Sequence, residues 1–511
     1  MPQRTAPVVA ALSSLFALAL TVMTLPAHAT AQSIPPNHDA SAMTGNEAED
    51  AIAVNPTNPL NIVTMSTLPD VVSGLFEGVS FDGGQTWTRQ VIGTGAPLGE
   101  ICCDEQLTFD RYGNLWMVYL LNTNGNVPIA LSTDGGLTLT KVTEIVPTKP
   151  TGSKSPKNAT SKRLRGPTKG VGADQPSISA GPSSVWVSWT SFPSTVVEAS
   201  GAAVSGLGQH GQFSTPEPVP TAKGKGDFGD TAVGPDGQVM VTYQDQTNGQ
   251  GGSHIYTALD PDGLGPAGFN DPVFIVHSRV GGFDYLPVQP DRSVDAEANL
   301  AWDRSGGLHD GRVYLVWTQE VKNESDNMDI MLQHSDDNGA TWSPAIRVND
   351  DSGTNSQVDP SIAVDQATGD VALSWLDARN DLGTGGPGDT DGIPNDDIQI
   401  WATYSTDGGD CPRAELPGER GDLERRRRPE LLRLRRLHAR GLRVSPVLPR
   451  VVGQLQQHGG QSGRDTSPAR SLHGERQHPV ASPRRSMIVR IPNARIACGP
   501  RRRTLHQELH P

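Results

Sequence analysis

A short hairpin pattern recurs along most of this chain and limits what it can fold into. The copy from Gln357 to Asp381 reads QVDPSIAVDQATGDVALSWLDARND, with apolar side chains at every second position on both sides of a turn that contains Gly369. Such alternation is typical of a half-buried pair of β-strands. One acidic residue, Asp359, stands where the first strand begins. The pattern therefore predicts a β-hairpin with an acidic residue at its entrance.

The same pattern occurs five more times, in the stretches EDAIAVNPTNPLNIVTMS, DEQLTFDRYGNLWMVYL, QPSISAGPSSVWVSW, FGDTAVGPDGQVMVTY and EANLAWDRSGGLHDGRVYLVW. When the six copies are aligned, the entrance holds what we call the entry residues: Glu49, Asp104, Gln175, Phe228, Glu297 and Asp359. Successive entry residues are 55, 71, 53, 69 and 62 positions apart. This spacing leaves room for about four strands of ordinary length with their loops. A repeated four-stranded unit of this size is typical of a β-propeller blade.

A second repeat, of eight residues, lies inside these units. The first copy is SFDGGQTW; two similar copies follow, and a fourth breaks off after its two glycines. An Asp followed by Gly-Gly or Asn-Gly suits a tight hairpin, because the carboxylate accepts backbone N–H groups across the turn and glycine adopts a positive φ without strain. The third and fourth units lack the repeat, although DPDGLG from Asp260 is similar to a degenerate copy. The defining residues are Ser80, Asp82, Gly84, Trp87, Ser132, Asp134, Gly136, Ser335, Asp337, Gly339, Trp342, Ser405, Asp407 and Gly409.

The eight-residue repeat resembles the Asp box, also called the BNR repeat, and the chain from about Glu49 to Gly409 is similar to the sialidase superfamily of β-propellers. The resemblance implies an all-β fold in which four-stranded blades surround a central channel. We predict six blades within residues 46–410 and leave a seventh open. We also expect the tryptophans of the second strands to be buried: Trp116, Trp189, Trp317 and Trp375.

The first 31 residues have the composition of a secretion signal. Arg4 supplies a positive charge, residues 8–25 are mostly apolar, and small residues around Ala29 fit a cleavage site. We expect residues 1–31 to be a signal peptide and residues 32–45 a linker, so that the protein is secreted or periplasmic. No other apolar run approaches the length of a membrane span. We therefore expect no membrane span, and a monomer.

The charge of the chain changes sign at the fourth Asp box. Residues 411–511 contain 22 of the 42 Lys and Arg, only 8 of the 56 Asp and Glu, and no Phe, Trp or Tyr. Because the change occurs inside a motif, our hypothesis is a frameshift near codon 410. The alternative is a genuine basic tail that binds nucleic acid or another acidic polymer. We expect the tail to be mostly disordered and unable to supply the outermost strand of the last blade; for the acidic propeller we expect no nucleic-acid partner.

Two of the four cysteines, Cys102 and Cys103, are adjacent and come just before the second entry residue. Neighbouring cysteines can close only a strained vicinal ring, and their spacing matches no zinc motif. Two interpretations stay open, a vicinal disulfide that stiffens a loop and a pair of packed thiols. Neither indicates catalysis.

The segment GPGDTDGIPNDD from Gly386 suits a calcium ion. Hard cations take several oxygen ligands, and alternate acidic residues separated by glycine allow one loop to surround an ion. The segment is similar to the calcium loops of thrombospondin type-3 repeats, and it lacks the final Glu of an EF-hand. We predict structural Ca²⁺; the alternative is a polar turn whose acids face water. The predicted ligands are Asp389, Asp391, Asn395 and Asp397.

Catalysis of the sialidase type would need particular residues. Resemblance to that family implies three arginines that bind the substrate carboxylate, a Tyr paired with Glu as nucleophile, and an Asp as acid/base catalyst. The Arg-Ile-Pro motif that carries the first of these arginines is missing before the first Asp box, and residues 411–511 contain no Tyr for the late nucleophile. Arg490 begins an Arg-Ile-Pro triplet, but it lies in the tail and matches in letters only.

The repeat nevertheless predicts that some polar residues lie close together, because equivalent positions of successive blades surround the same channel. The inner strands of a propeller line its channel, so Glu49 and the other acidic entry residues would form a ring around one mouth; the catalytic candidates are Asp104, Glu297 and Asp359. The arginine candidates for binding a substrate carboxylate are Arg292, Arg304 and Arg379. The alternative for the acids is structural, because an Asp at a strand entrance ties down a neighbouring turn. Similarly, Arg379 would pair with Asp377 or Asp381.

Two classes of function therefore remain open at the level of sequence. The first is an exported glycoside hydrolase of the exo-α-sialidase type. The second is a non-catalytic propeller that binds glycans or partners at a cell surface. A glycan or glycoconjugate is the expected partner in both, and the fold alone does not separate them.

Overall fold

The computed structural model describes residues 39–45, 47–148, 172–245, 249–381, 398–410 and 416–417. This part of the chain consists of strands and turns, and it holds no helix long and apolar enough to cross a membrane. The predicted signal peptide, the calcium segment around Asp391, and residues 411–511 other than Leu416 and Pro417 lie outside the described residues.

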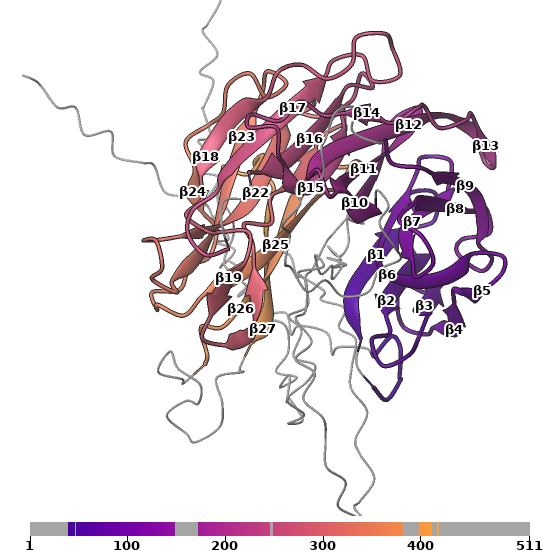
Figure 1. The fold of residues 1–511 in the computed structure, drawn as a ribbon, viewed down its shortest axis with the longest axis horizontal. Helices are drawn as coiled ribbons and strands as arrows, with labels where there is room; N and C mark the ends of the chain where they lie inside the picture. Colours follow the sequence, from indigo (N-terminus) through magenta and orange to yellow (C-terminus); the bar gives the residue numbers. More distant parts are fainter. Residues whose placement is uncertain are drawn as a thin grey trace, which may run out of the picture. The chain divides into compact units, whose positions relative to one another are not determined.

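Six antiparallel sheets follow one another along the chain and form a six-bladed β-propeller, as predicted. Each blade uses one continuous stretch of sequence, so the strands of a sheet share neighbouring colours in Figure 1. Blade 1 contains β1 (Ala48–Val54), β2 (Ile62–Thr67), β3 (Leu75–Ser80) and β4 (Thr88–Ile92). Blade 2 contains β5 (Thr94–Gly95), β6 (Gly99–Phe109), β7 (Leu115–Leu121), β8 (Val127–Ser132) and β9 (Thr140–Ile145). Blade 3 contains β10 (Gly172–Ala180), β11 (Ser184–Phe192), β12 (Val196–Gly206), β13 (Gln209–His210) and β14 (Glu217–Pro218).

The second half of the chain repeats this arrangement. Blade 4 contains β15 (Asp227–Val233), β16 (Val239–Gln244), β17 (His254–Asp260) and β18 (Val273–His277). A separate ribbon then pairs β19 (Asp284–Leu286) with β20 (Gln289–Val294). Blade 5 contains β21 (Asn299–Trp302), β22 (Val313–Glu320), β23 (Met328–Ser335) and β24 (Ile346–Arg347). Blade 6 contains β25 (Gln357–Val364), β26 (Val371–Asp377), β27 (Gln399–Ser405) and β28 (Leu416–Pro417).

The outermost strand of blade 6 corrects one prediction. We expected the Arg-rich tail to supply no such strand, and this was wrong, because β28 pairs with β27. The fourth strand of blade 5, β24, is equally short. A two-residue edge strand is held through its backbone, so it needs none of the apolar alternation that the tail lacks.

The core lies between neighbouring blades. The four tryptophans predicted to be buried on second strands are at most 1% exposed, which confirms that prediction. Trp116 of blade 2, for example, packs in one cluster with Ile178 and Val185 of blade 3. Burial of one large aromatic side chain stabilises a fold by about 1.5–3 kcal/mol. Contacts of this kind join each blade to the next.

All six entry residues share an unusual backbone conformation. Their φ angles lie between +45° and +57°, in the left-handed region that is unfavourable for residues other than glycine. In five of the six blades the pairing of the first two strands shifts register at this position, for example between Ala48 and Ala51 in blade 1 and between Val358 and Ser361 in blade 6. Such a shift is a β-bulge, which bends a strand and redirects a side chain. The repeated entry position is therefore a repeated bulge.

The Asp boxes connect the third and fourth strands of their blades by one set of hydrogen bonds. Ser335 Oγ donates to Asp337 Oδ1 (2.7 Å) and accepts the N–H of Gly339 (2.8 Å). The backbone N–H and the hydroxyl of Thr341 both donate to the Asp337 carboxylate, at 2.8 and 2.6 Å. The boxes that start at Ser80 and Ser132 repeat these contacts. The turn is thus closed by its own side chains.

A further contact, which the sequence did not indicate, joins the outer turn of one blade to the blade before it. The residue just before a second strand reaches the turn between the third and fourth strands of the next blade. The polar contacts are Asn61 Nδ2 to Gly135 O (2.9 Å), Asn114 Nδ2 to Gly206 O (3.0 Å), Gln238 Nε2 to Asn338 Oδ1 (3.1 Å) and Arg312 Nη1 to Gly408 O (2.8 Å).

Replacement of Asn61 by Ala should destabilise the protein by about 1–3 kcal/mol, because it leaves buried polar groups without a partner. Asn61 is fully buried and its amide also donates to Ser80 O. The matched control is Asn58→Ala in the same turn, whose side chain accepts only a weak bond of 3.4 Å from Leu60 N–H. Urea unfolding of both variants measures the difference; equal stability of the two would show that the inter-blade contact contributes nothing.

Candidate functional site

In each blade we call the long strand that begins the repeated hairpin the first strand; in blade 2 this is β6, which follows the two-residue β5. The first strands of consecutive blades lie side by side, in the order β1, β6, β10, β15, β21 and β25. This arrangement brings entry residues of neighbouring blades into direct contact. Asp104 N–H donates to Glu49 Oε2 (3.0 Å), and Gln175 N–H donates to Asp104 Oδ2 (3.2 Å). Phe228 N–H donates to Gln175 Oε1 (3.2 Å) in the same way. Each of these side chains therefore holds the bulge of the next blade.

Two carboxyl groups from neighbouring blades meet at one hydroxyl group. Thr67 Oγ1 lies 3.0 Å from Glu49 Oε2 and 2.8 Å from Glu105 Oε2. The hydroxyl has a single proton to donate, so one carboxyl group accepts it and the other donates its own proton to Thr67. Burial of Glu105, and then repulsion by Glu49, raise the pKa of Glu105 well above its ordinary value. The direction of this shift favours the protonated form of Glu105.

The acidic cluster continues into blades 2 to 4. Burial raises the pKa of Asp104 well above its ordinary value, and repulsion by Glu49 and Asp174 raises it further. Burial, and then Asp174, raise the pKa of Asp227 to about 8. Burial and mutual repulsion both favour the protonated form of a carboxyl group. Glu49, Glu105, Asp104, Asp174 and Asp227 thus form one group at the entry ends of the first strands, which we call the entry cluster.

The other two catalytic candidates occupy the entry positions of the last two blades. Glu297 and Asp359 are each 1% exposed. Glu297 N–H donates to Asp295 Oδ1 at 2.8 Å. Asp359 lies at the bulge of blade 6, next to Val358. The structure therefore places Asp359 in β25 and Glu297 two residues before β21, each with the positive φ that Asp104 has.

Arg304 lies at the opposite ends of the first strands. It follows β21, and its guanidinium donates to Ala180 O (2.8 Å) at the end of β10 and to Val233 O (2.7 Å) at the end of β15. Burial lowers its pKa to about 10. Arg304 thus joins the hairpins of three blades and does not meet the entry cluster. The side chain of Arg292, in β20, is outside the described residues.

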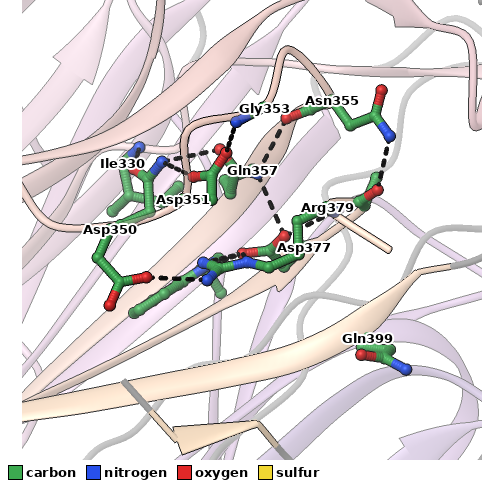
Figure 2. A network of polar contacts seen from close by, with 12 residues as sticks. Ile330, Asp350, Asp351, Gly353, Asn355, Gln357, Asp377, Arg379 and Gln399 are labelled. Atoms are coloured by element: carbon green, nitrogen blue, oxygen red, sulfur yellow. Dashed lines mark hydrogen bonds and ion pairs between the residues drawn. The ribbon is translucent and has the colours of Figure 1, made fainter. Parts of the chain in front are cut away.

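Arg379 lies just after β26 in the polar network of Figure 2. Its Nε and Nη2 atoms donate to Asp377 Oδ2 at 2.9 and 2.7 Å, and Nη1 donates to Asp350 Oδ1 at 3.0 Å. The guanidinium also lies over the ring of Trp401, 3.7 Å from its centre. Gln357 holds the other oxygen of Asp377 at 3.1 Å. The charge of Arg379 is therefore already compensated within the protein.

Sequence reasoning missed Glu105 and its partner Thr67. Regular alternation places consecutive residues on opposite faces of a strand, so only one acid of the Asp104–Glu105 pair was considered. The bulge breaks the alternation, and Glu49 repels both carboxyl groups. The sequence did contain a signal for Glu105, because this acidic residue directly follows the entry residue Asp104.

The cysteine pair lies beside this cluster. Cys102 and Cys103 form a vicinal disulfide directly before Asp104, which decides between the two interpretations of the sequence. Both residues are partly exposed, whereas Asp104 is buried.

No model of a protein family matches the chain, and a search of the curated proteins found no match. Among solved structures, an α-L-arabinanase of Penicillium chrysogenum complexed with arabinobiose is similar at 13% identity and a TM-score of 0.41, over 68% of this chain and 94% of that one. A GH93 α-L-arabinofuranosidase of Fusarium graminearum has 12% identity and a TM-score of 0.43, over 68% and 93%. A Hadza microbial sialidase has 12% identity and a TM-score of 0.37, over 78% and 71%. The assignment of a six-bladed propeller rests on the sheets of this chain.

Proposed function

We propose that this protein is an exported glycoside hydrolase that cleaves glycans at the entry cluster. The observation that supports it is the pair of carboxyl groups joined by Thr67, in which burial and the nearby Glu49 raise the pKa of Glu105. A glycosidase needs one carboxylic acid to protonate the leaving oxygen and one carboxylate on the other side of the bond. Two carboxyl groups whose environments separate their pKa values supply these two roles.

In this mechanism Glu105 protonates the glycosidic oxygen and Glu49 attacks the anomeric carbon. Because one hydroxyl contacts both carboxyl groups, they lie within about 6 Å of each other, nearer to the spacing of retaining than of inverting enzymes. Attack by Glu49 forms a glycosyl ester and releases the leaving alcohol. The Glu105 carboxylate then takes a proton from water, which hydrolyses the ester. The product keeps the configuration of the substrate.

The narrower proposal, an exo-α-sialidase, rests on the Asp boxes. It requires arginines that bind the carboxylate of the substrate. Arg304 and Arg379 instead contact carbonyl and carboxylate groups of the protein. We therefore favour a neutral glycan over a sialoside as the substrate. A non-catalytic glycan-binding propeller is the alternative, because binding needs only the scaffold and its loops.

A panel of aryl glycosides tests this proposal. We expect release of the aryl group from a neutral pentoside or hexoside and slower or no release from an α-sialoside. Proton NMR of the first product should show retention of configuration at the anomeric carbon. Hydrolysis of the sialoside alone would favour the narrower proposal, and binding without hydrolysis of any glycan in the panel would favour the non-catalytic propeller.

A further inference from the structure

Two side chains of the entry cluster, Glu49 and Asp104, and the neighbouring Cys103 carry atoms that suit one metal ion. One carboxylate oxygen of Glu49, one of Asp104 and the sulfur of Cys103 all lie within 4.8 Å of one another. Zinc binds thiolate and carboxylate ligands at about 2.0–2.3 Å in a tetrahedron, so its ligand atoms are about 3.5 Å apart. Shifts of about 1 Å would therefore bring these three atoms to one zinc ion.

The disulfide keeps the sulfur from this role. Cys103 Sγ is bonded to Cys102 Sγ, and the ligand for zinc is a thiolate, not a disulfide sulfur. Two carboxylates alone are a poor zinc site, because structural and catalytic sites use three or four protein ligands. The three residues therefore lack one ligand as long as the disulfide is intact.

A second, independent feature points to a cation at this place. Glu105 is fully buried, and its Oε1 atom has no hydrogen-bond partner among the described residues. Its other oxygen contacts Thr67, which also contacts Glu49. A buried carboxyl oxygen without a partner is costly, and a cation beside Glu49 would reduce the repulsion among these acids.

We propose that reduction of the Cys102–Cys103 disulfide creates a zinc site formed by Cys103, Asp104 and Glu49, with the Glu105 carboxyl group beside it. In the first step a dithiol supplies two electrons and two protons, becomes a disulfide itself, and leaves two thiols on the protein. In the second step Zn²⁺ displaces the protons of the Cys103 thiol and of the Asp104 carboxyl group, which leave to solvent, and binds the thiolate and the carboxylates. The oxidised protein lacks the site, so the redox state of one disulfide decides whether the entry cluster binds metal. The proposal does not rest on glycoside hydrolysis.

The test is a zinc titration by calorimetry on the full chain with Cys411→Ser and Cys498→Ser, which removes the other thiols. We expect one zinc ion per chain after reduction with a phosphine, and binding at least tenfold weaker without it. The matched variants are Cys102→Ser and Cys103→Ser, since both lack the disulfide. Cys102→Ser keeps the sulfur ligand and should bind zinc without reductant; Cys103→Ser should bind at least tenfold more weakly. Glu49→Gln should weaken binding to the reduced protein.

Cobalt(II) gives a second measurement that needs no substitution at the site. The reduced protein should show a thiolate-to-cobalt charge-transfer band in the near ultraviolet, which the oxidised protein lacks. Equal zinc affinity of the oxidised and reduced proteins, equal affinity of the Cys102→Ser and Cys103→Ser variants, or absence of the cobalt band after reduction would each overturn the proposal.

Discussion

Replacement of Glu105 by Gln should lower kcat on the best glycoside by about 10²–10⁴-fold, the usual contribution of a general acid. Glutamine has nearly the same shape, but it cannot supply a proton to the leaving oxygen. The loss should be much smaller for a dinitrophenyl glycoside, because that leaving group departs without protonation. Comparison of kcat for the two leaving groups therefore separates an acid catalyst from a residue that only maintains the fold.

Glu77→Gln is the matched control for this prediction. Glu77 is fully buried on β3, accepts a hydrogen bond from Gln90, and has a pKa that burial raises to about 7. It is thus another buried glutamate with a raised pKa, it forms no hydrogen bond with Thr67 in the described structure, and its replacement should leave kcat unchanged. If both variants lose activity equally for both leaving groups, Glu105 is not the acid.

The hairpin pattern was sufficient to predict the fold. Alternating apolar residues and a repeated entry position located all six blades, because that alternation predicts a strand and a propeller repeats the same strand pair. The same alternation concealed the conformation of the entry residues. A bulge adds a residue to a strand, and nothing in QVDPSIAV or EDAIAV marks φ of Asp359 or Glu49 as positive.

The partners of Arg304 could not be predicted from the sequence, whereas one partner of Arg379 could. Arg304 was a candidate for binding a substrate, and it donates instead to Ala180 O and Val233 O, which lie 124 and 71 residues away in the chain. Its partners are backbone carbonyls, which every residue carries, so no side-chain pattern could indicate them. Arg379 was different, because Asp377 is only two residues away in the chain. The sequence therefore allowed two interpretations of Arg379, substrate binding and pairing with Asp377 or Asp381, and the structure shows the pair with Asp377.

The protein should lose stability as the pH rises from about 4 to about 8. Burial raises the pKa of Asp227 to about 8, whereas an unfolded Asp titrates near 3.9. Between these values the folded state binds a proton that the unfolded state has released, so the free energy of unfolding falls with increasing pH. A shift of this size corresponds to a loss on the order of 5 kcal/mol for Asp227 alone. Glu77, whose pKa burial raises to about 7, acts in the same direction.

Asp227→Asn isolates this contribution, because asparagine does not titrate. Urea unfolding at about pH 5 and about pH 9 should show a loss of stability that is smaller in the variant than in the wild type by several kcal/mol. Asp236→Asn is the control: Asp236 is exposed in the turn after β15 of the same blade, and its replacement should leave the wild-type loss unchanged. If Asp227→Asn loses as much stability as the wild type between the two pH values, Asp227 is ionised in the folded protein. The entry cluster would then be held together by counter-charges and not by retained protons.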